Sequence, residues 1–251
     1  MQGEQITMQK ETEAWYASWF NTPYYHLLYK DRDHREAALF MNSLTGHLNL
    51  KENDTILDLA CGRGRHAKYL SRKGFDVTGV DLSEESIEYA KQFENPNLHF
   101  EVHDMCQPYP QKFDAVFNLF TSYGYFEHDI DNLRTIKAIK AELKPNGYGV
   151  IDFLNAKLTI ENLVPAEKKQ VDDILFDIEK YVKDGFIFKN IRFQDQGEDF
   201  FYTERVKALT LADFKAIFKE ANVELIDVFG DYHLNGFDEN TSERLILIFG
   251  R

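Results

Sequence analysis

Cysteine and proline are scarce in this 251-residue chain, which has two residues of the first and six of the second. Cys61 and Cys106 cannot build the disulfide framework of a small secreted domain, and neither has a partner at zinc-ligand spacing. No apolar run approaches the ~18 residues that span a membrane, and the first residues lack the apolar core of a signal peptide. The sequence therefore predicts a reduced, cytoplasmic protein without a bound metal.

Positive charge is also scarce, because 29 Lys and Arg stand against 42 Asp and Glu. Nucleic acids and anionic membrane surfaces are bound by basic faces, so both are disfavoured as partners. The chain is 43% hydrophobic and 14% aromatic, which excludes disorder and supplies a sizeable core. We expect a globular protein with a small-molecule partner, and a homo-oligomer is an open alternative.

From residue 54 onward, short apolar runs alternate with amphipathic helical runs. The expected strands are 55–59, 75–81, 98–104, 113–120 and 148–155, and helices are expected between them. This alternation predicts an α/β fold with a parallel sheet and helices on both faces. Two final apolar runs, 223–231 and 243–251, have no helix between them, so we expect them to be antiparallel neighbours.

Residues 171–208 break the alternation with three β-rich runs. Asp184-Gly185 is a strong hairpin signal and Gln196-Gly197 a weaker one, so the region predicts a three-stranded antiparallel insertion. Residues 1–50 are expected to be helical and to form a lid. The predicted domain comprises 51–170 together with 209–251, and 171–208 is inserted into it.

The segment from Ile56 to Arg65, ILDLACGRGR, places a strand directly before a glycine-rich turn and a helix start. Glycines let the backbone approach a ligand closely, and a helix N-terminus favours an anionic group. A dinucleotide site uses G-x-G-x-x-G, and here Ala67 stands at the third glycine position. Because alanine is also small, the glycines alone leave a dinucleotide and another nucleoside cofactor both open.

Acidic residues end the first three predicted strands: Asp58 lies just before the glycine turn, and Asp81 and Asp104 close the next two. In an open parallel sheet these carboxyl ends line the ligand crevice. Asp81 is placed to accept hydrogen bonds from ribose hydroxyls, and Asp104 to accept one from an exocyclic amine. Three carboxylates repel a pyrophosphate and favour a cationic or zwitterionic ligand.

Five segments in this order resemble class I S-adenosylmethionine-dependent methyltransferases: ILDLACGRGRH, VTGVDLS, HDM, FDAVFNLFTSYGYF and LKPNGYGVIDFLN. The similarity is greatest to the small-molecule branch with a β insertion after the fifth strand. It implies a doubly wound, seven-stranded mixed sheet of order 3-2-1-4-5-7-6, whose last strand is antiparallel. It also implies in-line transfer of a methyl group from S-adenosyl-L-methionine to an oxygen or nitrogen of a small molecule.

The resemblance further implies that Asp81 holds the cofactor ribose, that Leu82 and Met105 pack on the adenine, and that Asn118 and Leu119 line the methyl-transfer site. The Asn-Leu-Phe-Thr sequence at that last position differs from the Asn-Pro-Pro-Tyr associated with amino methylation of DNA bases or glutamine. The complete set of expected cofactor-binding residues is Tyr24, Tyr25, Asp58, Ala60, Gly62, Gly64, Asp81, Leu82, Asp104, Met105, Asn118 and Leu119.

Tyr24 and Tyr25 enter that set because the run YYHLLY looks like the tyrosine-bearing N-terminal element of related methyltransferases. The face of a tyrosine ring suits a sulfonium, with a cation–π contact of about 0.5–2 kcal/mol. Packing in the core is the alternative for both rings.

A general base is needed only if the methyl acceptor is protonated. The candidates for this role are Tyr123, His128, Tyr232 and His233. Two rival functions stay open, because fold alone does not specify chemistry. One is a nicotinamide-dependent oxidoreductase, and the other is a cofactor-binding protein without catalysis.

Overall fold

The structure, a computed structural model, describes residues 15–30 and 34–251. The chain forms two compact units. Unit 1 contains the described residues up to Lys30 together with Ile160–Ala208, and unit 2 contains those of 33–159 together with Leu209–Arg251. Within the described residues, no helix is both long and apolar enough to cross a membrane.

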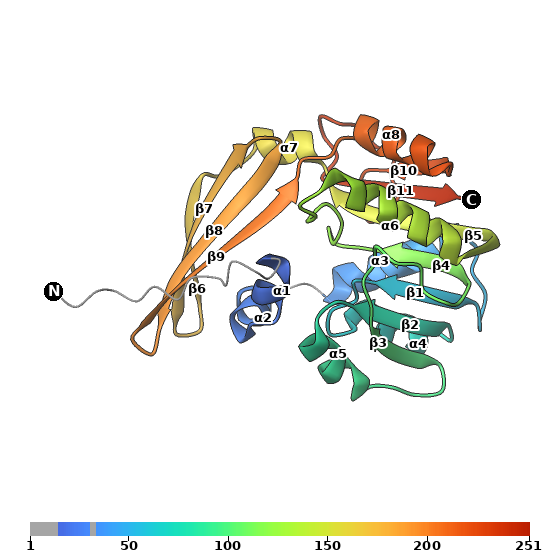
Figure 1. The fold of residues 1–251 in the computed structure, drawn as a ribbon, viewed down its shortest axis with the longest axis horizontal. Coiled ribbons are helices and arrows are strands. Elements are labelled where there is room, and N and C mark those ends of the chain that lie inside the picture. Colours follow the sequence, from blue (N-terminus) through green and yellow to red (C-terminus); the bar gives the residue numbers. More distant parts are fainter. Residues whose placement is uncertain (1–14, 31–33) are drawn as a thin grey trace. The chain divides into compact units, whose positions relative to one another are not determined.

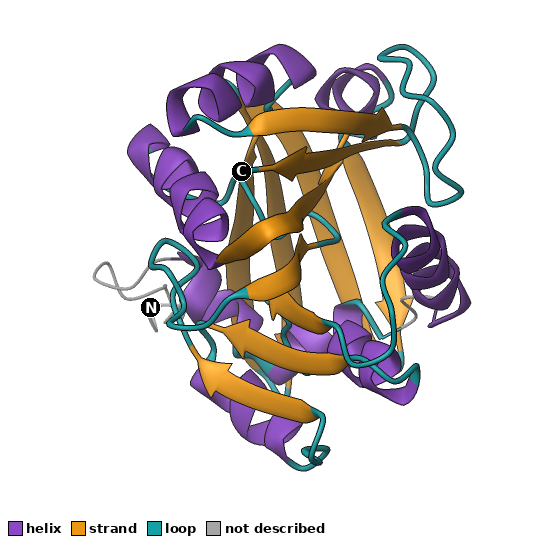
Figure 2. Ribbon diagram, turned by 90° about the vertical axis from the view of Figure 1, so that its right-hand side faces the viewer, coloured by secondary structure: helices purple, strands orange, loops and turns teal. Residues whose placement is uncertain are grey.

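Unit 2 is built on one seven-stranded sheet whose order is β10-β11-β5-β4-β1-β2-β3 (Figure 1), and strands are drawn as orange arrows in Figure 2. Strands β1 to β5 pair in parallel, and β11 runs antiparallel to both β5 and β10. Counted within this sheet, the order is 3-2-1-4-5-7-6, so the predicted topology is confirmed. The strands are β1 (Thr55–Leu59), β2 (Asp76–Asp81), β3 (Leu98–Val102), β4 (Phe113–Asn118), β5 (Leu143–Leu154), β10 (Glu224–Phe229) and β11 (Arg244–Gly250).

Helices pack on both faces of this sheet. They are α3 (His34–His47), α4 (Arg65–Arg72), α5 (Glu84–Lys91), α6 (Asp129–Glu142) and α8 (Leu211–Ala221). Residues of α3, α4 and α5 share one buried cluster with the sheet, whereas α8 packs on the other face through Phe214 against Phe153 and Phe218 against Phe249. Thr210 caps α8 reciprocally with Asp213.

The N-terminal region divides differently from the predicted lid over 1–50. Phe40, Met41 and Leu44 of α3 are fully buried against the sheet of unit 2, so this helix belongs to the core. The shorter helices α1 (Trp15–Phe20) and α2 (Pro23–Leu28) belong to unit 1 instead. An amphipathic helix shows an apolar face in its sequence, but the sequence does not say which surface that face covers.

Unit 1 contains an antiparallel sheet of order β6-β7-β8-β9, formed by β6 (Ala166–Val171), β7 (Ile174–Lys183), β8 (Phe186–Asp195) and β9 (Glu198–Lys207). The prediction of three strands from residue 171 is therefore wrong by one strand. The sequence of β6, AEKKQV, is almost wholly polar because it forms a sheet edge, so it lacks the alternation that marks a strand. A short helix, α7 (Ala156–Glu161), precedes it.

Two of the three hairpin turns of the four-stranded sheet form at the predicted dipeptides. Asp184 and Gly185 have φ of 50° and 77°, and Gln196 and Gly197 have φ of 51° and 85°. Two successive left-handed residues are the geometry that a two-residue hairpin turn needs, because its twist matches that of the strands.

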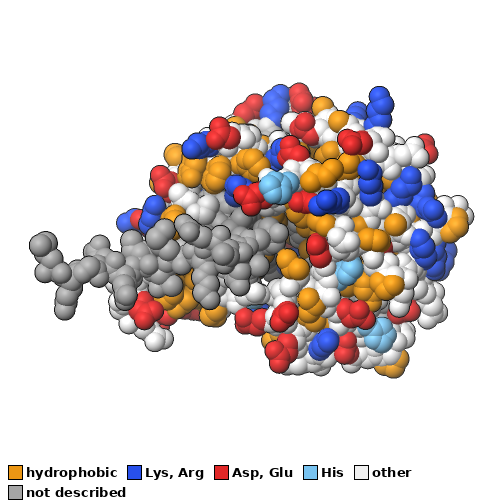
Figure 3. All heavy atoms as spheres, viewed as in Figure 1, with side chains coloured by type: hydrophobic (Ala, Val, Ile, Leu, Met, Phe, Trp, Pro, Cys, Tyr) orange, Lys and Arg blue, Asp and Glu red, His pale blue; other side chains and the backbone are white. Residues whose placement is uncertain are grey.

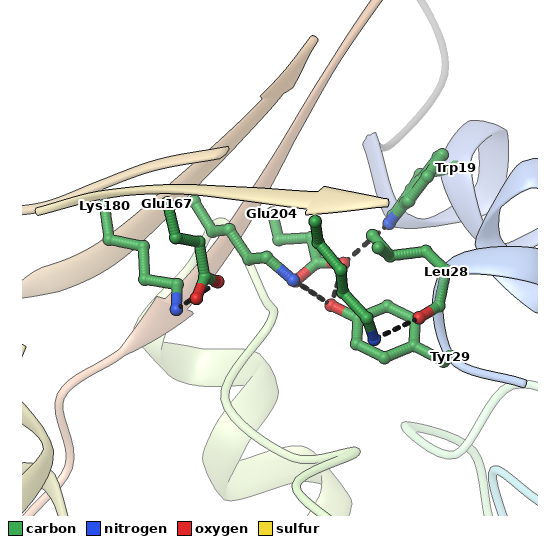
Figure 4. Close-up of polar contacts among 8 residues, drawn as sticks. Trp19, Leu28, Tyr29, Glu167, Lys180 and Glu204 are labelled. Carbon is green, nitrogen blue, oxygen red and sulfur yellow. Dashed lines mark hydrogen bonds and ion pairs between the residues drawn. The ribbon is translucent and has the colours of Figure 1, made fainter. Parts of the chain in front are cut away.

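Helices α1 and α2 cover one face of the four-stranded sheet. Trp19 and Leu28 are buried with apolar side chains of β7 and β8. Glu204 of β9 accepts hydrogen bonds from Trp19 Nε1 at 2.7 Å and from the Tyr29 hydroxyl at 2.7 Å (Figure 4). The apolar contacts and these polar contacts together fix the two helices on the sheet.

On the molecular face drawn in Figure 3, acidic, basic and hydrophobic side chains are interspersed.

Candidate active site

The carboxyl ends of β1, β2 and β3 lie side by side, because these strands are sheet neighbours. The register pairs Leu59 with Val80 and Asp81 with Val102. The amide of His103 donates to the Asp81 carbonyl oxygen at 2.9 Å, which extends the pairing past the end of β3. The three expected acidic positions therefore follow one another along a single edge of the sheet.

The glycine-rich turn after β1 has a left-handed backbone. Ala60, Gly62 and Gly64 have φ of 63°, 54° and 72°. The amide of Gly62 donates to Asp81 Oδ2 at 2.7 Å, and the amide of Cys61 donates to the Val80 carbonyl at 2.9 Å. The turn is thus attached to the end of the neighbouring strand β2.

Asp81 joins two backbone segments. Its other carboxylate oxygen, Oδ1, accepts from the amide of Ser83 at 2.9 Å, at the start of α5. Burial raises the pKa of Asp81 above its usual value, although the amides of Ser83 and Gly62 favour its charged form. Next to it, Leu82 has 47% of its surface exposed.

Asp58 is 2% exposed, and its Oδ2 accepts one hydrogen bond, from the amide of Ala67 at 3.0 Å. Burial raises its pKa to about 7, and the charge of Asp81 adds to this effect. The guanidinium of Arg65 acts in the opposite direction. A cation that binds near this carboxyl group would stabilise its charged form and lower its pKa.

The segment after β3 reaches the end of β4. Asp104 is exposed, and its Oδ1 accepts from the amide of Cys106 at 2.9 Å. The side-chain Nδ2 of Asn118 donates to the Leu59 carbonyl oxygen at 3.1 Å and contacts Met105 Sδ at 3.7 Å. Asn118 Oδ1 is buried and has no hydrogen-bond partner among the described residues. The expected residues Asp104, Met105 and Asn118 therefore lie around the end of β1.

The segment after Asn118 is strained. Leu119 is buried, and the next two residues, Phe120 and Thr121, have φ of 56° and 60°. A bulky residue or a β-branched one in the left-handed region is a genuine outlier, and such strain gathers at functional sites. Sequence inspection missed this segment, because Phe-Thr carries no signal for that conformation.

A buried ion pair, also missed from the sequence, supports the strained segment. Asp152 of β5 is fully buried, and its Oδ1 accepts from Arg244 Nε at 2.8 Å and Nη2 at 2.7 Å. Arg244 Nη2 also donates to Thr121 Oγ1 at 2.9 Å. The one available signal was an acidic residue inside the otherwise apolar run of β5.

Aromatic rings gather beside this ion pair. The ring of Phe120 stacks on that of His66 at 4.7 Å, with 9° between the planes, and lies 5.2 Å from the ring of Tyr232. The Tyr232 hydroxyl donates to Asp152 Oδ2 at 3.3 Å, and its ring packs on Phe40 at 4.4 Å. Of the four candidates for a general base, Tyr232 is the one that lies in this cluster.

The other three candidates lie elsewhere. Tyr123 is fully buried, and its hydroxyl donates to the Asn132 carbonyl at 2.6 Å, which is the position of a core residue. His128 is exposed at the N-terminus of α6. His233 is exposed, and its amide donates to Asp231 in a turn.

Tyr24 and Tyr25 belong to unit 1, where they pack on their own sheet and on neighbouring rings. The Tyr24 hydroxyl donates to Asp195 Oδ2 at 2.8 Å, and its ring lies 4.6 Å from that of Phe193. The ring of Tyr25 lies 5.8 Å from that of Trp19. Their expected contact with a cofactor therefore stays a prediction.

Residues 56–147 match the model of a family described as "Methyltransferase domain". The chain is 32% identical to "Putative methyltransferase YqeM" of Bacillus subtilis (strain 168) over 158 residues, which are 61% of this chain and 54% of that protein. The chain thus spans about half the length of the curated relatives it matches first.

Among solved structures, an S-adenosylmethionine-dependent methyltransferase from Clostridium acetobutylicum superposes with a TM-score of 0.76 at 23% identity, over 90% of this chain and 95% of that one. The sugar N-methyltransferase KedS8 from Streptoalloteichus superposes with a TM-score of 0.74 at 18% identity, over 100% and 98%. At these identities the two structures establish a common fold.

Proposed function

Because residues 56–147 belong to the methyltransferase domain family and the chain has the class I methyltransferase fold, we propose that it is an S-adenosylmethionine-dependent methyltransferase. The proposed reaction transfers a methyl group to an oxygen or nitrogen atom of a small molecule. The observation that carries the proposal is the arrangement of Asp58, Asp81 and Asp104 along one sheet edge, beside a glycine turn bonded to Asp81.

The surface at this edge fits the proposed cofactor. Leu82 and Val102 are 47% and 48% exposed, and they flank the strand ends that carry Asp81 and Asp104. An adenine ring placed there would remove this apolar surface from water, at about 25 cal/mol per Å². The Asp81 carboxylate has about four lone-pair sites and accepts from the backbone amides of Gly62, Ser83 and Leu82, so it can still accept a hydrogen bond from a ribose hydroxyl.

S-adenosylmethionine, when bound, supplies a methyl group already activated by its sulfonium. The chain then needs chiefly to hold the two reactants in line, which is worth up to about 7–11 kcal/mol. Asn118 ends β4 and Leu119 follows it, between the acidic edge and the aromatic cluster, where both would line the methyl-transfer site. Tyr232, whose hydroxyl donates to Asp152, would contact the acceptor.

A nicotinamide dinucleotide fits the same edge less well. Its diphosphate would lie against the glycine turn, close to the buried Asp58 and the half-buried Asp81. The charged forms of both carboxyl groups are already disfavoured by desolvation, and a diphosphate beside them would disfavour those forms further.

Calorimetric titration with S-adenosylhomocysteine tests the proposal. We expect the wild-type chain to bind it and Asp81→Ala to bind at least ~10-fold more weakly, a change of about 1.4 kcal/mol. Asp76→Ala is the matched control, because Asp76 begins the same strand at its other end. Equal affinity of wild type and Asp81→Ala would mean that the ribose lies elsewhere. Binding of NADH without binding of S-adenosylhomocysteine would favour the oxidoreductase.

Proton release provides a second test of the cofactor site. The pKa of Asp58 is raised to about 7, and a cationic ligand nearby stabilises its charged form, so binding should lower that pKa and expel protons. We expect S-adenosylmethionine to release a fraction of a proton near pH 6.5, measured by calorimetry in buffers of different ionisation enthalpy. Asp58→Asn should abolish the release, and proton uptake by the wild type would contradict the assignment.

A methyl-transfer assay distinguishes the proposed enzyme from a protein that binds the cofactor without catalysis. Radiolabelled S-adenosylmethionine incubated with a panel of small amines and phenols should label at least one of them. Tight binding of S-adenosylhomocysteine combined with no labelled product across the panel would support the non-catalytic alternative.

A further inference from the structure

The segment 119–121 follows directly after Asn118, at the edge where the proposed methyl transfer takes place. Phe120 and Thr121 are successive residues in the left-handed region, and neither is glycine or asparagine. Such a conformation persists only where the surroundings determine it. The contacts that determine it here come from strands β5 and β11, which are far from this segment in sequence.

Asp152 contacts the strained segment through both its side chain and its backbone. Its Oδ2 accepts from the amide of Phe120 at 2.8 Å, and its carbonyl oxygen accepts from the amide of Thr121 at 3.0 Å. Arg244 holds the other carboxylate oxygen and donates to the Thr121 hydroxyl. With the Tyr232 hydroxyl also donating to Oδ2, the buried carboxylate is fully satisfied.

We propose that Asp152 and Arg244 are positioning residues, which hold segment 119–121 in its strained conformation and thereby place Phe120 and Tyr232 on the acceptor side of the methyl-transfer site. The proposal rests on the proposed function, because the acceptor side is defined by it. Neither residue needs to touch the reacting atoms. The pair acts through the backbone of Phe120 and through the hydroxyls of Thr121 and Tyr232.

A second ion pair, at the opposite end of β5, joins that strand to β4 and serves as a comparison. Asp114, near the start of β4, accepts from Lys144 of β5 at 2.7 Å and from the amide of Thr55 at 2.8 Å. It supports β1 and β4 where no expected ligand residue lies. If both ion pairs served only to hold neighbouring strands of the sheet together, weakening either pair would have similar effects.

The experiment compares Arg244→Lys and Thr121→Val with the control Lys144→Met. Lysine keeps a positive charge beside Asp152, but one ammonium cannot reproduce the fork that bonds both Asp152 and Thr121. Valine has the shape of threonine without the hydroxyl that Arg244 contacts. Because both changes leave the buried carboxylate a charged neighbour, the variants are expected to fold.

Three quantities are measured: amide hydrogen exchange of a peptide containing residues 119–122, the affinity for S-adenosylhomocysteine, and the affinity for sinefungin. Sinefungin carries an amine at the position of the transferable methyl group, so its affinity reports on the acceptor side without a known acceptor. We expect Arg244→Lys and Thr121→Val to exchange at least ~10-fold faster in this peptide. They should bind S-adenosylhomocysteine within ~3-fold of wild type and change the sinefungin affinity at least ~5-fold.

Lys144→Met should alter none of the three quantities at the site. Exchange of residues 119–122 that is unchanged in Arg244→Lys and Thr121→Val would overturn the positioning role. Parallel losses for S-adenosylhomocysteine and sinefungin would also overturn it, since the pair would then serve the whole cofactor site. A wild-type chain that binds neither compound would instead overturn the proposed function, while the exchange comparison would still test whether the pair holds the segment.

Discussion

Alanine at position 64 is expected to lower the free energy of unfolding by about 3 kcal/mol. Gly64 has φ of 72°, where a side chain costs about 1–2 kcal/mol. A Cβ atom at this position would also lie 2.5 Å from Cε1 and Cζ of the Phe100 ring. Phe100 is 1% exposed and is confined as well by Gly79, so the ring cannot move away without disturbing β2.

Gly62→Ala is the matched control for this prediction. Gly62 has φ of 54° in the same turn, but a Cβ there would meet no atom within 4 Å. The decrease in the free energy of unfolding of Gly62→Ala should therefore be limited to the cost of the left-handed backbone, about 1–2 kcal/mol. Urea unfolding of both variants provides the comparison. Equal losses in the two variants would mean that the Phe100 ring does not restrict the turn.

A double-mutant cycle refines the same test. Phe100→Leu removes ring atoms that the new methyl group would meet, so Gly64→Ala should be less harmful in that background. A coupling free energy near zero would contradict the steric account.

Glutamine at position 142 is expected to stabilise the protein by about 3 kcal/mol at pH 8 and to have little effect at pH 4. Glu142 ends α6 and is fully buried, with Oε1 accepting from the amide of Tyr109 at 2.8 Å. Its second oxygen has no hydrogen-bond partner among the described residues. Burial raises its pKa from 4.5 to about 7.

The sign of the pH dependence follows from the protons bound in each state. Between pH 4.5 and about 7 the folded state keeps the proton of Glu142 whereas the unfolded state loses it, so stability falls as pH rises. Below this window both states are protonated, and above it the loss is complete. Asp58, whose pKa is also raised to about 7, changes stability in the same direction.

Urea unfolding at pH 4, 6 and 8 measures this effect, with Glu220→Gln as control. Glu220 lies in the last turn of α8 and is exposed, so its replacement should leave the free energy of unfolding nearly unchanged across the range. If the free energy of unfolding changed with pH in parallel for the wild type and for Glu142→Gln between pH 5 and pH 8, this carboxyl would be charged without penalty in the folded state, and the prediction would be wrong.

Local sequence predicted the elements of unit 2 well. The strand at 55–59, the turn with Gly62 and Gly64, and the helix cap at Thr210 are all encoded within about ten residues. Hydrophobic period, glycine spacing and cap residues act over this range, so they are readable without coordinates. The order of the strands followed from the resemblance to a family, which the comparisons support.

Several features of the candidate site could not be read in this way. Tyr123 has the residue type of a candidate base but is buried in the core, and β6 has a polar sequence yet forms a strand. Asp152 and Arg244 are 92 residues apart, and the sequence around each residue does not indicate that the two form an ion pair.

The sequence by itself therefore determined the alternating α/β architecture, the glycine turn and the acidic residues that end three strands. The tertiary structure alone decided that Thr121 meets Arg244, that Tyr232 joins Asp152, and that Asn118 reaches the end of β1. The physical reason is the distance along the chain over which each kind of interaction acts. Propensity and periodicity act between residues close in the chain, whereas buried ion pairs and backbone strain depend on which distant segments the packed sheet brings together.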